Sequence, residues 1–275
     1  MNIVAWMVIK DDAYYADMAV KGVLPYVSGI YVQDQASTDN SVQVIKDTVD
    51  DKVPLIIEIE DTGLKRFDPE YNETVYRSLA IKRARKLFSS DWLLQFDADD
   101  YYTPYFFGKL VELEESGKLD RYNSVRQAAE RFVTPEYRAR AADNELGSVF
   151  VVNGEAYLDP HTRLWRSNLP CEYIQNPEFV GSEYQYLHCI LHPEPVPTYW
   201  LPGMCVIHLH RIFGPKAWSF WAESGDVFER TIPFNPRRQA PKHFESDKAM
   251  GNAVYMPYDW PDFILKKWKE WAIYD

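Results

Sequence analysis

The sequence has few of the features that mark secreted proteins. Among its 275 residues there are only three cysteines, Cys171, Cys189 and Cys205, and no Cys-x-x-Cys pair. An odd and sparse cysteine count excludes a disulfide framework and is typical of proteins kept in a reducing compartment. We therefore expect a cytoplasmic protein whose cysteines are buried as small apolar side chains.

Long apolar runs are absent as well. No stretch approaches the roughly 20 apolar residues needed to cross a bilayer, so stable membrane insertion is not expected. The apolar run Ile3–Ile9 has no basic leader before it and no small-residue cleavage site after it, and Asp11 and Asp12 follow it closely. Its length is that of a strand rather than of a targeting segment. Internal repeats and low-complexity tracts are also missing.

Basic residues are the minority among the charged ones. The 30 Lys and Arg residues face 41 Asp and Glu residues, which gives a formal net charge of −11. Proteins that bind nucleic acid through its phosphates rely on clustered basic side chains, so this class of partner is disfavoured. The basic stretch Lys82–Lys86 reads first as a solvated helix face, and a local basic groove there stays open as an alternative. A hydrophobic fraction of 46% is typical of a folded globular chain.

The first half of the chain alternates between strand-like and helix-like segments. The expected strands are Ile3–Ile9, Gly29–Asp34, Val53–Ile59 and Trp92–Phe96. The expected helices are Ala13–Gly22, the segment after the capping residues Ser37–Ser41, and Tyr71–Phe88, the last with Val75, Leu79, Ala80 and Leu87 on one face. The alternation predicts an α/β fold with a mostly parallel, doubly wound (Rossmann-like) sheet and helices on both faces.

Carboxylates follow several of the expected strands. Asp11, Asp34 and Asp97 all fall at strand ends, and in doubly wound sheets ligands bind at the carboxyl ends of the strands. In Asp97-Ala98-Asp99 two carboxylates at i and i+2 can reach one hard divalent cation, which in turn can bridge a diphosphate. Such a short motif also arises by chance as a solvated acidic turn, so on its own it leaves both interpretations open.

Four segments in order carry a resemblance to a known family. They are Val8-Ile9-Lys10-Asp11-Asp12, Val32-Gln33-Asp34-Gln35-Ala36-Ser37-Thr38-Asp39-Asn40-Ser41, Leu94-Gln95-Phe96-Asp97-Ala98-Asp99-Asp100 and, more loosely, Thr162-Arg163-Leu164-Trp165-Arg166. Together they resemble the family 2 type of glycosyltransferases with the GT-A fold. Lys10-Asp11-Asp12 replaces the Asn-Glu pair that is usual after the first strand of that family.

The resemblance implies a nucleotide-diphosphate sugar as donor, with UDP as the first expectation, and Mn²⁺ or Mg²⁺ as cofactor. It implies that Asp34 contacts the nucleoside, that Asp97 contacts the ribose or the metal, that Asp99 holds the metal directly, that Ala98 takes part in donor binding, and that Val8 and Lys10 line the base pocket. It also suggests a glycosyltransferase domain over residues 1–212, with a donor half over 1–105 and an acceptor half over 106–212. Residues 213–275 would then form an extension that packs on the core.

The composition changes near residue 150. All six histidines, seven of nine tryptophans and 13 of 18 prolines lie beyond it, which predicts short strands, ordered loops and an irregular, aromatic-rich C-terminal part. Aromatic faces there can stack on a saccharide or another hydroxyl-bearing acceptor. The tail Tyr255–Asp275 is expected as a helix packed on the core, with an oligomer contact or a membrane-surface helix as alternatives.

Two histidines lie close together late in the chain. His208 and His210 face the same side of a strand-like stretch, a spacing that allows metal ligation and equally allows two hydrogen-bonded structural histidines. The resemblance favours one of the two as a further metal ligand, and the sequence does not distinguish them.

An inverting transfer needs a carboxylate that takes the acceptor's proton. The candidates beyond residue 150 are Glu155, Asp159, Glu172, Glu178 and Glu183, of which we name Glu172 because it follows the Arg163–Arg166 strand and a proline turn. A retaining transfer needs no such base. The sequence thus predicts a metal-dependent glycosyltransferase. The alternatives are a nucleotide- or carbohydrate-binding protein without catalysis and a glycosyltransferase acting on modified DNA bases. A nucleotidyltransferase is disfavoured, since no Gly-rich phosphate loop follows the first strand.

Overall fold

The centre of the protein is one large mixed sheet. The structure is a computed structural model that describes residues 1–61, 63, 73–130, 132–134, 137–139, 149–152, 155–158, 160–175, 189–209, 253–255 and 258–272. The sheet has eight strands in the order β3-β2-β1-β4-β11-β6-β14-β5. Their bounds are β1 Ile3–Ile9, β2 Gly29–Asp34, β3 Leu55–Ile59, β4 Trp92–Gln95, β5 Asp100–Tyr102, β6 Ser124–Glu130, β11 Pro160–Arg166 and β14 Thr198–His208.

Most of the sheet is parallel. β1 pairs in parallel with both β2 and β4, and β2 pairs in parallel with β3. β11 runs antiparallel to its neighbours β4 and β6, and β5 runs antiparallel to β14, while β14 and β6 are parallel to each other. Only β11 and β5 therefore oppose the direction of the remaining strands, so the prediction of a mostly parallel sheet is confirmed.

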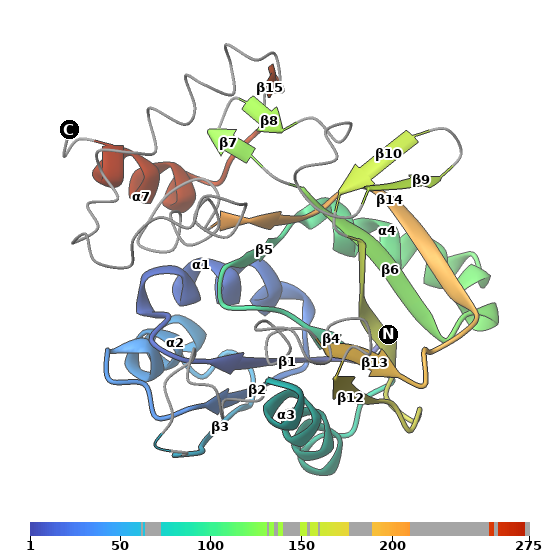
Figure 1. Ribbon diagram of the computed structural model, residues 1–275, viewed down its shortest axis with the longest axis horizontal. Coiled ribbons are helices and arrows are strands. Elements are labelled where there is room, and N and C mark those ends of the chain that lie inside the picture. Colours follow the sequence, from blue (N-terminus) through green and yellow to red (C-terminus); the bar gives the residue numbers. More distant parts are fainter. Residues whose placement is uncertain are drawn as a thin grey trace.

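Helices cover both faces of the sheet, as Figure 1 shows. One face carries α1 (Ala13–Val23), α2 (Ser41–Val49) and α4 (Pro104–Glu115), and the other carries α3 (Glu73–Leu87). The first of these layers buries a continuous apolar core that includes Val20, Ile30, Ile45 and Phe106. The second packs Ala80 and Ile81 of α3 against Trp6 and Trp165. This two-sided covering explains why the central strand β1 is apolar along its whole length rather than alternating.

Smaller elements surround the main sheet. Three short sheets consist of β9 (Val149–Val152) with β10 (Glu155–Leu158), β12 (Glu172–Gln175) with β13 (Cys189–His192), and β7 (Phe132–Thr134) with β8 (Tyr137–Ala139) and β15 (Ala253–Tyr255). The last helix described is α7 (Asp262–Ala272), beside α1 in Figure 1. In the part of the chain that the structure describes, no helix is long and apolar enough to cross a membrane.

The α7 helix packs on the body of the protein, as the sequence predicts for the tail. Ile264 and the preceding Trp260 are buried against Tyr15 and Met18 of α1 and Tyr101 of β5. The burial of Cys171 and Cys205 as free thiols is confirmed as well, and the side chain of Cys189 lies outside the described residues. The division at residues 105 and 212 stays a prediction.

Three local predictions differ from the structure. Val75 and Leu87 were expected on the inner face of α3 but are 56% and 39% exposed, because the helix buries Tyr76, Ala80, Ile81 and Ala84 instead. The residues Ser37–Ser41 were expected to cap α2. Its N-cap Asn40 makes no side-chain cap, and most of the polar side chains before it bond elsewhere, as described below. The third strand starts at Leu55 rather than Val53.

Two isoleucines of the sheet that differ in burial allow a test of the described core. Ile30 of β2 is fully buried, whereas Ile59 of the edge strand β3 is 65% exposed. Ile30→Ala should lower the free energy of unfolding by about 2–5 kcal/mol, since it removes buried methyl groups and leaves a cavity. Ile59→Ala makes the same chemical change on the surface and should cost less than about 0.5 kcal/mol. Urea unfolding of both variants measures the difference, and equal losses would contradict the described core.

Candidate functional site

The polar site lies at the carboxyl ends of neighbouring parallel strands. The segment Lys10–Asp12 follows β1, Gln35–Asn40 follows β2, and Asp97–Asp99 follows β4. The sheet order β2-β1-β4 places the first and third of these loops on either side of the point where the winding of the sheet reverses. In open α/β sheets this switch point is where ligands bind, because the loops on its two sides diverge and leave a crevice.

The loops after β1 and β2 are bonded to each other. Asp11 Oδ1 accepts hydrogen bonds from the backbone N–H groups of Thr38 (2.6 Å) and Asp39 (3.2 Å). Asp12 N–H donates to Ser41 Oγ at 2.7 Å, and Lys10 Nζ donates to the carbonyls of Gln35 (2.5 Å) and Ala36 (3.2 Å). The hydroxyl and carboxyl side chains before α2 thus serve chiefly to join the two loops.

This junction holds strained and charged groups in place. Asp11 and Ala36 adopt positive φ angles of 54° and 53°, a conformation that side-chain-bearing residues rarely adopt. Burial raises the pKa of Asp11, but the N–H groups of Thr38 and Asp39 outweigh it and lower that pKa overall. Backbone strain of this kind persists where surrounding bonds fix it, and such positions cluster at binding sites.

Asp34, predicted to contact a nucleoside, is the last residue of β2. It is only 2% exposed, and its carboxylate accepts the backbone N–H of Ser37 at 3.1 Å and its hydroxyl at 2.5 Å. These bonds fold the chain sharply after β2. The contact with a nucleoside stays a prediction.

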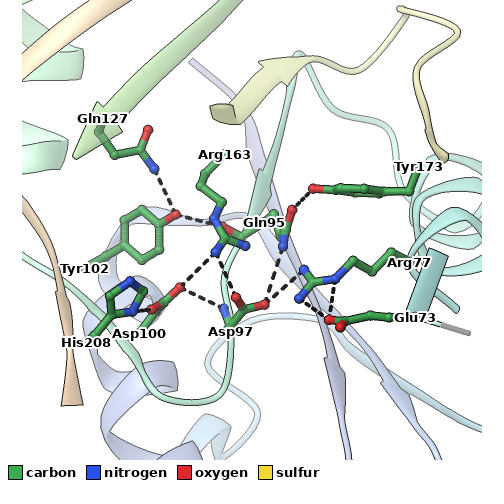
Figure 2. Close-up of polar contacts among 10 residues, drawn as sticks. All are labelled: Glu73, Arg77, Gln95, Asp97, Asp100, Tyr102, Gln127, Arg163, Tyr173 and His208. Atoms are coloured by element: carbon green, nitrogen blue, oxygen red, sulfur yellow. Dashed lines mark hydrogen bonds and ion pairs between the residues drawn. The ribbon is translucent and has the colours of Figure 1, made fainter. Parts of the chain in front are cut away.

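Asp97 lies between two arginines, as Figure 2 shows. Its Oδ2 is 2.9 Å from Arg163 Nη2 of β11, and its Oδ1 is 3.1 Å from Arg77 Nη1 of α3. Arg77 also binds Glu73 through Nε at 2.7 Å, so the guanidinium bridges two carboxylates. The three side chains Asp97, Arg163 and Arg77 are 24%, 11% and 13% exposed.

The arginines decide the ionisation of this carboxyl. Burial raises the pKa of Asp97 and so does the neighbouring Asp99, but the guanidiniums of Arg163 and Arg77 outweigh both and hold that pKa well below its usual range. Burial likewise lowers the pKa of Arg163, and the charges of Asp97 and Asp100 reverse this and raise it above its ordinary value. Asp97 is therefore a permanent anion between permanent cations.

Asp100 and His208 form the next pair in the same network. Asp100 Oδ1 is 2.5 Å from His208 Nδ1, and Asp100 Oδ2 is 3.8 Å from Arg163 Nη2. The two residues lie opposite each other in the antiparallel pairing of β5 with β14. The Asp100 carboxylate faces Nδ1 of the ring, an arrangement common for histidines that bind metals through the other ring nitrogen.

A row of neutral polar groups lies behind the charged ones (Figure 2). Tyr102 donates its hydroxyl to the Gln95 carbonyl at 2.7 Å and accepts from Gln127 Nε2 at 3.2 Å. The hydroxyl of Tyr173 donates to Gln95 Oε1, and Gln95 Nε2 donates to Asp97 Oδ1 at 3.4 Å. These bonds link β4, β5, β6 and β12 behind the Asp97 loop.

Asp99 lies between this network and the end of β14. Its carbonyl accepts the N–H of Leu209 at 2.8 Å, which ties the loop to β14. Its charge raises the pKa of Asp97. Counting only the carboxylates Glu73, Asp97, Asp99 and Asp100 against the guanidiniums Arg77 and Arg163, the formal charge is 2 − 4 = −2. Within the described residues, no three or more His, Cys, Asp or Glu side chains are already arranged to hold a metal ion.

The structure brings some of the predicted site residues together and separates others. Asp97, Asp99 and His208 belong to the network around β4, β5 and β14, and Ala98 between the two aspartates is buried in the apolar core. Lys10 and Asp34 lie at the ends of β1 and β2, and Val8 packs beside them against the α3 face. His210, Asp159, Glu178 and Glu183 lie outside the described residues, as does the side chain of Glu155.

Glu172, the predicted base, lies on the surface beside α3 and has no described contact with the Asp97 network. It is half exposed at the start of β12 and pairs with Lys82 of α3 at 2.9 Å, and this ion pair lowers its pKa. Its neighbour Tyr173 reaches the network, and β-strand alternation turns Glu172 away from it. A role for Glu172 as base stays a prediction without a described contact to the Asp97 loop. Lys82 and Arg83 both pair with carboxylates, which accounts for part of the basic stretch as a salt-bridged surface.

Sequence reasoning missed most partners of Asp97. Arg77 was expected outside the apolar stripe of its helix, and nothing in the pattern distinguishes it from the exposed Arg83. Glu73, four residues before Arg77, gave the one local signal, since an i,i+4 pair of opposite charges stabilises a helix. Arg163 and Gln95 were noted as parts of motifs without a role, and Tyr102 and Tyr173, which bond to Gln95, were not considered.

The arginine contacts generate a pH-dependent prediction. Asp97→Asn removes the anion between two buried guanidiniums and should lower the free energy of unfolding by roughly 2–4 kcal/mol near neutral pH. The pKa of Asp97 is lower in the folded state than in the unfolded state. The ionised carboxylate therefore stabilises the fold fully above the unfolded-state pKa of about 3.9, and this stabilisation is lost as the pH falls from there toward the folded-state pKa. The gap between the wild type and Asp97→Asn should therefore narrow below about pH 4.

Urea unfolding at several pH values measures this gap. The exposed Glu115 of α4 supplies a matched control, since Glu115→Gln makes the same carboxylate-to-amide change without an arginine partner. A gap of constant size from pH 7 to pH 3 would contradict the described ion pairs.

Comparisons with known proteins place the chain beside glycosyltransferase structures. No family model matches the sequence, and no curated protein matches it. Among solved structures, S. aureus TarS is similar at 14% identity and a TM-score of 0.48, over 75% of this chain and 36% of that one. The chain thus spans about a third of the full TarS structure, and it covers 80% of TarS 1–349 at a TM-score of 0.45.

The mannosyltransferase PcManGT from Pyrobaculum calidifontis, in complex with GDP-Man and Mn²⁺, is similar at 12% identity and a TM-score of 0.35, over 48% of this chain and 36% of that one. Likenesses at these identities and TM-scores do not by themselves assign an activity to this chain.

Proposed function

We propose that this protein is a metal-dependent glycosyltransferase that moves a sugar from a nucleotide-diphosphate sugar, with UDP as the first choice of nucleotide, to a hydroxyl-bearing acceptor. One observation carries the proposal: the loops after β1 and β4, with Lys10–Asp12 and Asp97–Asp99, flank the switch point of the sheet. The motif resemblance of these same segments to family 2 glycosyltransferases supplies the reaction.

The charge of the site supports a divalent cation. The four carboxylates and two guanidiniums around Asp97 leave a local charge of −2, which an ion such as Mn²⁺ or Mg²⁺ would neutralise. Hard divalent ions in diphosphate sites often take only one or two protein carboxylates, since phosphate oxygens and waters complete their coordination. Asp99 is the first ligand we assign, because Asp97 is already occupied by two arginines. His208, whose Nδ1 faces Asp100, is the second.

The protein's own side chains would then position the donor, and the bound cation would stabilise the charge that develops on it. Asp97, fixed as an anion, is suited to accept a hydrogen bond from a ribose hydroxyl, and Asp34 is suited to the nucleoside. The bound cation would neutralise charge on the departing diphosphate, which is the largest electrostatic requirement of such a transfer. The network behind Asp97 would keep these groups in place before the donor arrives, so that little reorganisation is needed during reaction.

Metal-linked nucleotide binding tests the site. Asp99→Asn should abolish the Mn²⁺-dependent part of the thermal stabilisation by UDP, because it removes the ligand charge and leaves the fold contacts of the backbone intact. The wild type should gain about 2.7 kcal/mol at a UDP concentration 100 times its dissociation constant. Asp120→Asn, the same change at an exposed position, is the matched control and should respond like the wild type. Equal Mn²⁺-dependent shifts in all three proteins would exclude Asp99 as the ligand.

Donor hydrolysis separates the enzyme from a binding protein. Glycosyltransferases often release sugar slowly from their donor to water, so the wild type incubated with Mn²⁺ and a UDP-sugar should produce UDP, and Asp99→Asn should produce at least tenfold less. Release of UDP from UDP-sugars and of GDP from GDP-sugars is followed by chromatography. Tight nucleotide binding with no release from any of these donors, even with candidate acceptors present, would favour the non-catalytic alternative.

A further inference from the structure

We infer that α7 is a positioning element that joins the two donor-binding loops, with Lys267 as its key residue; this inference rests on the proposed function. α7 is the last described helix and lies more than 150 residues beyond Asp99 in sequence. Its contacts nevertheless reach the elements that carry both Lys10–Asp12 and Asp97–Asp99.

The first set of contacts is to the start of α1. Lys267 Nζ donates to the carbonyl of Tyr14 at 2.6 Å and pairs with Asp17 Oδ1 at 2.5 Å. The first turn of α1 is continuous with the loop after β1, since the carbonyl of Asp12 accepts the N–H groups of Tyr15 (3.0 Å) and Ala16 (3.1 Å). The ammonium group of Lys267 therefore holds the helix turn that directly follows the Lys10–Asp12 loop.

The second set of contacts is to the Asp99 loop. Phe263 of α7 packs edge-on against Tyr101 with ring centroids 6.0 Å apart, and Tyr101 is two residues after Asp99. Leu209, whose N–H bonds the Asp99 carbonyl, is fully buried in the same apolar cluster as Ile264. β5 and the end of β14 therefore meet α7 on one face, through Tyr101 and Leu209, and carry the Asp100 and His208 side chains on the other.

Both sets of contacts, to α1 and to the Asp99 segment, come from the single helix α7, so α7 links the two loops in addition to burying apolar surface. β1 and β4 are neighbours in the sheet, but their loops leave it on opposite sides of the switch point. α7 is held to the first turn of α1 by the Lys267 ion pair and to the Asp99 segment by the packing of Phe263 on Tyr101. It therefore restrains the distance between the loops after β1 and β4. A nucleotide bridged between them would bind more weakly when that restraint is loosened.

The test compares two lysines of α7. Lys267 is 25% exposed and paired, while Lys269 is exposed two residues later in the same helix. Lys267→Met should raise the dissociation constant for UDP, measured by titration calorimetry in saturating Mn²⁺, by about tenfold. Lys269→Met, with the same loss of charge, should change it less than twofold. Lys267→Arg restores a cation with a longer reach and should recover most of the affinity.

A local measurement separates positioning from general destabilisation. Hydrogen exchange should speed up at the amides of Tyr15 and Ala16 in Lys267→Met, and at the Leu209 amide in Phe263→Leu, with core amides of β1 unchanged. If Lys267→Met does not fold, as judged by circular dichroism, Phe263→Leu decides the question by the same affinity comparison.

The possible failures are distinct. If the wild type binds no nucleotide with any divalent metal, the proposed function fails and the inference fails with it. If the wild type binds UDP and Lys267→Met binds it as tightly as Lys269→Met does, the positioning role alone is wrong.

Discussion

The Asp97 carboxylate between two guanidiniums is the interaction on which the candidate site depends. Arg163 comes from β11 and Arg77 from α3, so a single side chain holds together an antiparallel strand, a helix and the end of the parallel strand β4. A partly buried anion is stabilised when it is paired and hydrogen-bonded, and each partner is in turn fixed by a further contact. Removing one member leaves the others with uncompensated charge.

The sequence predicts the frame of this arrangement well. The apolar run Ile3–Ile9 and the segment Gly29–Asp34 predict β1 and β2 to the residue, and β1 is apolar throughout because helices cover the sheet on both sides. The carboxyl ends of β2 and β4 then locate Asp34 and Asp97 at one edge of the sheet. Both conclusions follow from local pattern and from the geometry that every doubly wound sheet shares.

What the sequence does not predict are the long-range partners. Arg77 lies 20 residues before Asp97, Arg163 lies 66 residues after it, and Tyr173 reaches Gln95 from 78 positions away. Such pairings depend on the packing of α3, β11 and β12 against the sheet, which no local periodicity encodes. The same limitation explains the inner face of α3: Val75 and Leu87 suit an apolar stripe, but the helix turns so that Arg77 meets Asp97 and both apolar residues face solvent.

The arrangement of the Asp99 segment shows how such distant contacts act together. β5 separates a polar layer from an apolar one: Asp100 and Tyr102 bond to His208, Gln95 and Gln127 on one face, and Tyr101 packs with α1 and α7 on the other. Polar networks fix direction because hydrogen bonds are angular, whereas apolar packing fixes separation because it resists both gaps and overlap. A loop restrained in both ways has few alternative conformations, and this is the property a site needs if its charges are to be in place before a ligand arrives.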